Sequence, residues 1–133
     1  MLPQDRLIQA RVRATNSLGE GSVSSVNTVG ILAQTVPHKP PSAPVRDAAT
    51  TPSTLVVEYP TLEGDYTGGN QIVSLHLQWD TGTGGETWTT LIGEAPYATS
   101  TSYSYSSALI DAGRVYKFRY RARNAIGWGE YSD

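Results

Sequence analysis

The sequence predicts an all-β protein built around a small β-sandwich, and three observations support this prediction. Four stretches alternate apolar and polar residues with a period of two, which is typical of half-buried strands; they cover residues 7–14, 55–59, 72–79 and 115–122. Thirteen glycines, eight prolines and eight tyrosines favour strands that are joined by tight turns. The third observation is an internal repeat, because residues 6–25 resemble residues 114–133.

Composition and charge exclude several classes of partner. The net charge of −2 provides no general attraction to nucleic acid or to an anionic membrane. No apolar run approaches the roughly 18 residues that a membrane helix needs, and the N-terminal segment lacks the apolar core of a signal peptide. The absence of cysteine excludes a disulfide scaffold and leaves the compartment open. We therefore expect no nucleic-acid partner and no direct membrane insertion.

The remaining elements follow from turn residues and weaker strand patterns. Further strands are expected at residues 23–34, 86–93 and 101–107. The glycine-rich stretch 81–86 is expected to be a hairpin loop, since no Gly-Lys-Ser/Thr follows it to bind phosphate. Four prolines within residues 36–44 predict a stiff, extended linker. No helix longer than one turn is expected.

The internal repeat divides the chain. At an offset of 108, eight of twenty positions are identical without a gap: Arg6/Arg114, Arg11/Arg119, Arg13/Arg121, Ala14/Ala122, Asn16/Asn124, Gly19/Gly127, Gly21/Gly129 and Ser24/Ser132. A period near 100 residues is typical of tandem β-sandwich domains and too long for a solenoid. We expect a strand hairpin that closes a preceding repeat at 1–36, a proline-rich linker at 37–44 and a further domain at 45–133.

Several motifs of the second part resemble those of one family. Prolines open it at 40–44, residues 110–116 form a corner that ends in Tyr116, and an alternating pattern then leads through Ala122 to Asn124. In these features residues 41–133 resemble fibronectin type III domains, which are immunoglobulin-like β-sandwiches. The resemblance implies strands A to F within 45–133, with strand G missing, and an F–G hairpin within 1–36. Departures from the family pattern are Tyr59 in place of a tryptophan, Ala112 in place of a proline, and Ile8 at the corner position of the first copy.

Alternation assigns each residue of the sandwich to a face. The residues expected to be buried are Leu55, Val57, Tyr59, Leu75, Leu77, Trp79, Tyr116, Phe118, Tyr120 and Ala122. Those expected to point outward are His76, Gln78, Arg119 and Arg121. A register shift by one residue would exchange the two sets.

The candidate interaction face is a row of cations along the outward side of residues 117–123. Lys117, Arg119, Arg121 and Arg123 repel one another unless aromatic rings or carboxylates lie between them. The candidate neighbours are Trp88, Trp128, Tyr131 and Glu130. We expect Arg119 or Arg121 within about 6 Å of a tryptophan or tyrosine ring. Two interpretations stay open, a structural zipper and a binding face for an acidic partner.

Catalytic and metal-binding patterns are weak in this sequence. His38 and His76 lie far apart without a paired nucleophile, and His76 is expected to be solvated. Glu63 and Asp65 provide too few oxygen ligands for a calcium loop and are explained better by a turn. The Arg-Gly-Asp motif, with which this family binds integrins, does not occur. We expect no enzymatic activity, no cofactor and no metal.

The resulting functional hypothesis is a non-enzymatic structural or adhesive module of a tandem-repeat extracellular or cell-surface protein. Its expected partners are other protein modules, either copies of itself or neighbouring repeats. A missing strand G would leave strand 115–122 with an open edge, which residues 23–34 of another molecule could pair with to build a head-to-tail filament. A longer covalent array would make the same contacts. The alternatives are a spacer module of a carbohydrate-active enzyme and a cytoplasmic, cytoskeleton-associated scaffold module.

Overall fold

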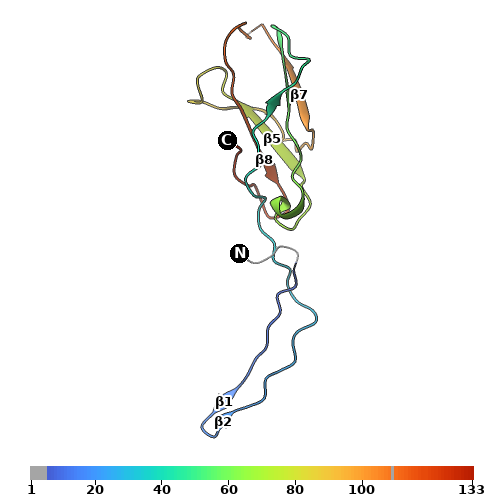
Figure 1. Ribbon diagram of the computed structural model, residues 1–133, viewed down its shortest axis with the longest axis vertical. Helices are drawn as coiled ribbons and strands as arrows, with labels where there is room; N and C mark the ends of the chain where they lie inside the picture. Colours follow the sequence, from blue (N-terminus) through green and yellow to red (C-terminus); the bar gives the residue numbers. More distant parts are fainter. Residues whose placement is uncertain (1–5, 109) are drawn as a thin grey trace.

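The computed structural model describes residues 6–108 and 110–133, so the first five residues of the expected 1–36 hairpin lie outside the described residues. It has two parts, an elongated hairpin and a β-sandwich, joined end to end (Figure 1). The described strands and the single 3-10 turn are β1 (Thr15–Asn16), β2 (Gly19–Glu20), β3 (Val45–Arg46), β4 (Thr54–Glu58), η1 (Gly64–Thr67), β5 (Ser74–Trp79), β6 (Thr89–Ile92), β7 (Ser102–Ser106) and β8 (Phe118–Arg123). Among the described residues, no helix has the length and apolarity needed to cross a membrane.

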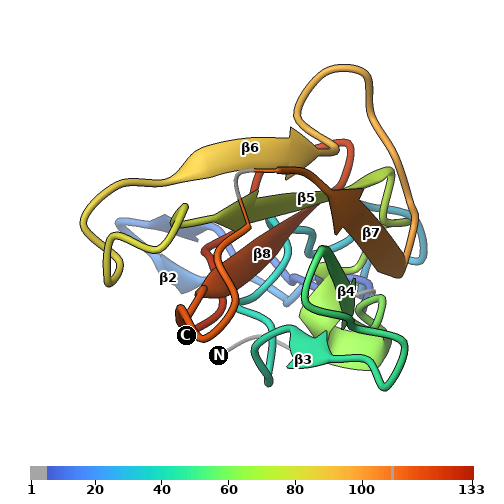
Figure 2. The same ribbon diagram turned by 90° about the horizontal axis from the view of Figure 1, so that it is seen from above.

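Two antiparallel three-stranded sheets form the sandwich (Figure 2). The first sheet has the order β3-β4-β7 and the second has the order β6-β5-β8. Residues 80–88 connect β5 to β6, as expected for the glycine-rich hairpin loop. The prediction of an all-β sandwich is therefore confirmed.

The core lies between the sheets and has the expected register. Leu77 of β5 pairs with Tyr120 of β8, and Leu75 pairs with Ala122. The predicted core residues that are buried are Val57, Tyr59, Leu75, Leu77, Trp79, Tyr120 and Ala122. Leu55, Tyr116 and Phe118 are only half-buried, because they line an open groove.

Two hydrogen-bonded corners fix the start of β8. The hydroxyl of Tyr116 accepts a hydrogen bond from the backbone N–H of Asp111 at 2.8 Å, so the expected tyrosine corner is present. The carboxylate of Asp80 accepts from the N–H groups of Gly82 and Lys117 at 2.8 and 2.9 Å. Burial opposes ionisation of Asp80, but these backbone hydrogen bonds hold its pKa below the usual range.

The expectation that β8 has an unpaired edge is wrong for the C-terminal half of the strand. Residues 127–132 fold back along β8, where Gly129 N–H donates to Ala122 at 2.9 Å and Ser132 N–H donates to Tyr120 at 2.8 Å. This antiparallel segment takes the place of the first half of a strand G. The turn 124–127 makes this return possible, since the side chain of Asn124 accepts from the N–H groups of two turn residues.

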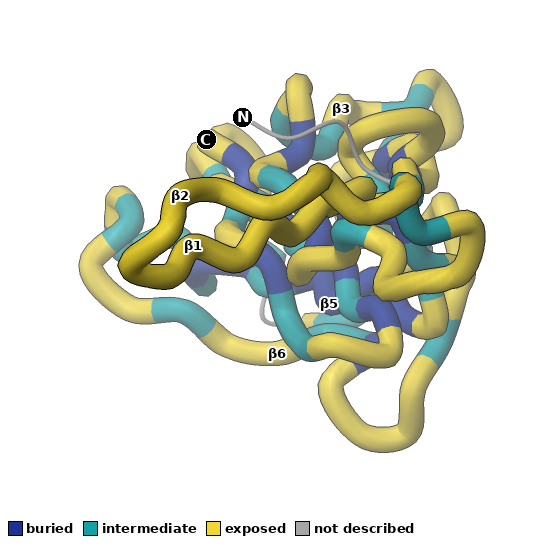
Figure 3. Tube along the Cα trace, turned by 90° about the horizontal axis from the view of Figure 1, so that it is seen from below, coloured by how far each residue is buried: buried dark blue, intermediate teal, exposed yellow. Residues whose placement is uncertain are grey.

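The N-terminal hairpin repeats this arrangement at the same offset of 108. Gly21 N–H donates to Ala14 at 2.9 Å, and Ser24 N–H donates to Val12 at 2.9 Å. The hydroxyl of Ser24 also accepts from Val12 N–H, as Ser132 accepts from Tyr120 N–H. Among the described residues of the hairpin, however, continuous strand pairing is confined to β1 and β2, with one further bridge between Leu7 and Leu32, and most of the hairpin is exposed (Figure 3). The hairpin thus has the hydrogen bonds of the repeat without a sandwich beneath it.

Candidate functional site

The candidate site is a ladder of arginines and aromatic rings on the outer face of the β6-β5-β8 sheet. Alternation along β8 directs Arg119, Arg121 and Arg123 to this face. The returning segment 127–132 places Trp128 and Tyr131 over the same face. We call the set formed by Trp88, Arg119, Tyr131, Arg121, Trp128, Arg123 and Tyr97 the arginine–aromatic ladder.

Cations and rings alternate along the ladder. The Arg119 guanidinium lies 4.1 Å from the centroids of both Trp88 and Tyr131. Arg121 lies 4.5 Å from Tyr131 and 4.7 Å from Trp128. The prediction that an arginine of this row lies against a tryptophan or tyrosine ring is confirmed. Each such contact contributes about 0.5–1 kcal/mol at an exposed site and more where water is excluded.

The third rung uses a ring that the sequence did not indicate. Arg123 lies 4.9 Å from Tyr97 and 5.9 Å from Trp128, and the Tyr97 ring meets Trp128 edge-on at 6.1 Å. Tyr97 lies in the long connection between β6 and β7, where no periodicity predicts a direction. Only the packing of this connection against the sheet reveals its role.

Lys117 does not join the ladder. Its ammonium group donates a hydrogen bond to the carbonyl oxygen of Gly84 at 2.9 Å, in the loop between β5 and β6. The carboxylate beside the ladder belongs to Glu94, which lies 3.9 Å from Arg121, and not to the expected Glu130. Six of the seven residues in the expected interaction face therefore lie in one stack. The seventh, Lys117, is hydrogen-bonded to the neighbouring loop instead.

His76 was expected in solvent, and this expectation is wrong. The residue has no exposed surface, because the rings of Trp128 and Tyr131 cover it at centroid distances of 5.5 and 5.7 Å. Alternation places His76 correctly on the outer face, opposite Arg121, but it cannot reveal that residues 128–131 cover that face.

The protonation state of His76 follows from its neighbours. Its Nδ1 atom lies 3.2 Å from Arg121 Nε, which is always a donor, so Nδ1 accepts and carries no proton. The proton then lies on Nε2, which is 2.9 Å from the hydroxyl oxygen of Thr90. Burial, followed by the charge of Arg121, lowers the pKa of His76 to about 4, and the more distant Glu94 carboxylate does not reverse this. The imidazole is therefore neutral at physiological pH.

The chemistry of the ladder is that of a filled structural site. Aromatic rings cover the faces of the guanidinium groups, and Arg119 also donates two hydrogen bonds to Gln78 Oε1 at 2.9 and 2.8 Å. Within residues 6–108 and 110–133, no three His, Asp or Glu side chains come together as metal ligands. The ladder therefore has the ring contacts that the structural-zipper interpretation requires.

Comparisons with solved structures show which known folds the chain resembles. The chain is similar to a multi-domain segment of titin, with a TM-score of 0.59 and 20% identity over 99% of this chain and 40% of that chain. It is also similar to the chicken CNTN1 FN1–FN3 domains, with a TM-score of 0.55 and 21% identity over 92% of this chain and 39% of that chain. The chain thus spans about two fifths of the length of each structure.

These likenesses agree with the tyrosine corner, the strand orders and the returning segment 127–132. Together they define the sandwich as an all-β domain with the fibronectin type III fold. Neither a family model nor a curated protein sequence matches the chain.

Proposed function

We propose that the chain is a non-enzymatic structural or adhesive module of a tandem-repeat protein, and that it holds successive modules at a fixed angle. The observation that carries this proposal is the way residues 34–38 leave the hairpin and attach to one pole of the sandwich. We call this attachment the linker anchor. It makes the proline-rich segment a rigid joint where the sequence indicated only a stiff spacer.

Backbone and side-chain hydrogen bonds form the linker anchor. Thr35 N–H donates to the carbonyl of Gly68 at 2.9 Å, and His38 N–H donates to Tyr66 at 3.0 Å, so η1 and the residue after it hold the linker from one side. Asn124 holds it from the other, because its Nδ2 atom donates to the carbonyls of Thr35 and Thr67 at 2.7 and 2.9 Å. Lys39 pairs with Asp133, which fixes the returning segment to the same linker.

Two glycines permit this close approach. A Cβ atom at Gly129 would collide with the carbonyl oxygen of Pro37, and one at Gly68 would collide with that of Thr35. Pro37 is fully buried as a result. Backbone contact at this distance leaves the linker little freedom to swing, which is what a fixed joint between modules requires.

A matched pair of substitutions tests the joint. Gly129→Ala displaces Pro37, whereas Gly21→Ala, at the equivalent position of the hairpin, meets only Ala14 O at 3.3 Å. In small-angle X-ray scattering, the wild type and Gly21→Ala should give one narrow distribution of dimensions. Gly129→Ala should give a broader one while the sandwich keeps its near-ultraviolet circular dichroism. The proposal fails if the wild type is already as broad as Gly129→Ala.

The setting that we propose is extracellular or at the cell surface, with other protein modules as partners. The likenesses to titin and to CNTN1 are compatible with an intracellular as well as an extracellular location. The alternatives are therefore a cytoskeletal scaffold module and a spacer module of a carbohydrate-active enzyme. Antibody staining of intact, unpermeabilised cells should detect the protein. Staining that requires permeabilisation would favour the cytoskeletal alternative. The finer form of the proposal is head-to-tail filament assembly by strand complementation between copies of this chain.

A further inference from the structure

Strand β7 is an edge strand of the β3-β4-β7 sheet and lies at the margin of the sandwich (Figure 1). It pairs with β4 over its whole length, from Ser102 opposite Glu58 to Ser106 opposite Thr54. Along its other side, the part of the chain that the structure describes places no hydrogen-bonded strand. An edge of this kind presents unused N–H and C=O groups to an extended segment that comes beside it.

Two hydrogen bonds show which residues of β7 direct their backbone groups to this open edge. Tyr59 N–H donates to the carbonyl of Thr101 at 2.9 Å, so odd-numbered residues bond to the β4 side. Asp47 N–H donates to the carbonyl of Val56 at 2.9 Å, so Val56 directs its backbone groups toward β3. Ser104 lies opposite Val56 and therefore directs its own groups away from β4. The residues with outward backbone groups are Ser102, Ser104 and Ser106.

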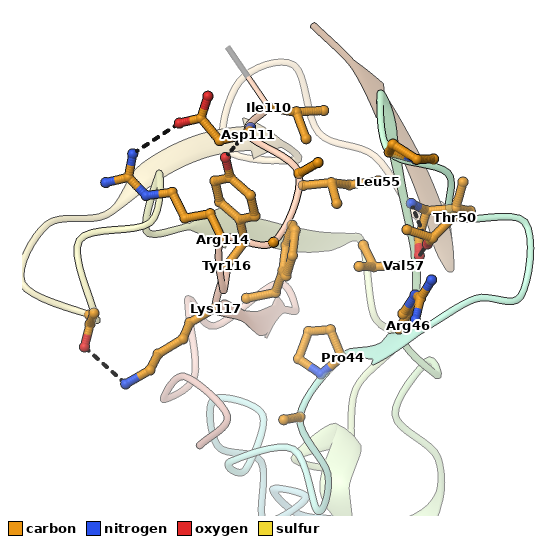
Figure 4. A pocket seen from close by; sticks show the side chains of 18 of the residues that line it. Pro44, Arg46, Thr50, Leu55, Val57, Ile110, Asp111, Arg114, Tyr116 and Lys117 are labelled. Carbon is orange, nitrogen blue, oxygen red and sulfur yellow. Dashed lines mark hydrogen bonds and ion pairs between the residues drawn. The ribbon is translucent and has the colours of Figure 1, made fainter. Parts of the chain in front are cut away.

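The side chains of β7 alternate between the core and solvent. Leu55 and Val57 of β4 point into the space between the sheets (Figure 4), and Tyr105 and Tyr103 lie opposite them. Opposed residues share a face, so both tyrosines lie on the inner side, where Tyr105 packs against Trp79 at a centroid distance of 4.7 Å. The three serines are exposed on the outer side. Their small side chains leave room for a neighbouring strand.

The β7 edge lacks the features that commonly protect edge strands from pairing, which are charges, prolines, bulges and short length. Residues 95–108 contain no charged side chain, and β7 contains no proline. At the opposite edge of the same sheet, β3 has two residues, follows Pro44 and contains Arg46. At the edge of the other sheet, β6 has a register shift against β5, and Glu94 follows it closely. Of these three edges, β7 is therefore the one suited to pairing.

We propose that the β7 edge pairs with the β7 edge of a second copy of this chain, antiparallel, about a two-fold axis at Ser104. The sequence selects this partner, because Ser-Tyr-Ser-Tyr-Ser reads the same in both directions. In this register Ser104 opposes Ser104 of the second copy, and Ser102 opposes Ser106. The outward N–H and C=O groups of all three serines then meet their counterparts. A shift by one residue would set these groups against residues whose backbone bonds face β4.

The pairing joins two three-stranded sheets into one continuous sheet with the order β3-β4-β7-β7-β4-β3. Tyr103 opposes Tyr105 of the second copy on the inner face, and serine opposes serine on the outer face, so no charges are brought together. Because both copies use the same surface, the contact closes after two chains. It goes beyond the proposed function, since the fixed joint orders modules within one chain and the β7 contact joins two chains side by side.

Disulfide trapping reads the register directly, since the chain has no cysteine of its own. Ser104→Cys should form a disulfide-linked dimer with itself under mild oxidation, because opposed residues lie about 5.5 Å apart between their Cα atoms. Ser102→Cys alone should stay unlinked, whereas a mixture of Ser102→Cys and Ser106→Cys should give a linked heterodimer. All three positions are exposed, so random collisions would link every variant to the same extent. Equal linking of Ser102→Cys and Ser104→Cys therefore overturns the proposal.

Sedimentation velocity measures the association without a cross-link. The wild type should sediment faster as its concentration rises, up to the value of a dimer. Ser104→Lys should remain at the monomer value, because the two-fold axis would place like charges opposite each other. Ser42→Lys is the matched control, since it has the same net charge and is exposed in the segment before β3. It should behave as the wild type.

Ser104→Pro is a second variant that blocks the edge in a different way. The Ser104 N–H faces outward, so a proline there leaves the ladder between β7 and β4 intact and removes a donor that the second copy needs. This variant should also remain monomeric while it keeps the near-ultraviolet circular dichroism of the sandwich.

A wild type that stays monomeric at every concentration overturns the proposal, and so does association that persists in both Ser104 variants. The fixed joint is measured separately, by the scattering of Gly129→Ala. Loss of the β7 contact would leave that joint intact, and a dimer whose hairpins scatter as broadly as those of Gly129→Ala would overturn the joint alone.

Discussion

At the scale of single residues, His76 shows how a buried polar group is tolerated on the outer face of a sheet. Both ring nitrogens have partners, Arg121 and Tyr131 at Nδ1 and Thr90 at Nε2. A buried group that is fully hydrogen-bonded costs little, whereas a second proton on the ring would face the Arg121 N–H. The site therefore accepts a neutral imidazole and disfavours a charged one.

This preference predicts an acid-sensitive stability. The folded pKa of about 4 lies below the value of about 6.5 in the unfolded chain, so the unfolded state binds more protons as the pH falls. Stability is fully present above pH ~6.5 and is lost progressively toward pH ~4, by up to about 3 kcal/mol. Urea unfolding at several pH values measures this loss.

His76→Gln is the control for this prediction, because an amide does not titrate. The difference between wild type and variant isolates His76 from carboxylates such as Asp80, whose lowered pKa also removes stability in acid. Parallel stability curves for the two proteins between pH 7 and pH 4 would show that His76 is not the sensor.

At the scale of elements, the returning segment 127–132 contributes more than a set of hydrogen bonds to β8. Trp128 lies against His76, Arg121 and Arg123, whereas the ring of Trp88 stacks on Arg119 at the end of the ladder. The segment therefore acts as the lid of the outer face of the sheet. Without it, the arginine row would be a line of repelling charges above an imidazole open to water.

A pair of tryptophan substitutions measures this difference. Trp128→Ala should cost about 3 kcal/mol, because it removes a large packed ring and exposes a buried group, whereas Trp88→Ala should cost about 1 kcal/mol. Thermal unfolding gives both values. In Trp128→Ala the pKa of His76, followed by NMR, should also rise toward its ordinary value. Equal losses of stability in the two variants would contradict the larger role that the structure assigns to Trp128.

At the scale of the whole molecule, stability is concentrated in the sandwich. The hairpin exposes most of its apolar side chains, among them Val12, Leu18, Val29 and Ile31. Isolated two-stranded hairpins are marginally stable in water, so this part opens far more often than the sandwich. Its persistence depends on the linker anchor at one end.

Limited proteolysis should expose this contrast. Trypsin should cut first after Arg11 or Arg13, which are exposed in the hairpin, and the fragment that retains the linker anchor should keep the unfolding midpoint of the whole chain. Gel electrophoresis and thermal unfolding of the purified fragment test both statements. Early cleavage inside β5 or β8 would contradict this distribution of stability.

The sequence by itself determined the sandwich, the faces of β5 and β8 and the repeat at offset 108. Those features arise from local periodicity, since a strand must send alternate side chains to opposite faces whatever lies beyond them. The same alternation, with the repulsion between like charges, was enough to predict a cation–π contact for Arg119 or Arg121, and both residues make one.

Only the tertiary structure decided what covers each face. It placed Trp128 and Tyr131 over His76, brought Tyr97 to Arg123 and anchored the linker with Asn124. It also left Leu55, Tyr116 and Phe118 half-buried, although their pattern is that of full core residues. The physical reason is that burial depends on segments remote in the chain, and the local period of a strand carries no information about which of them will return to cover it.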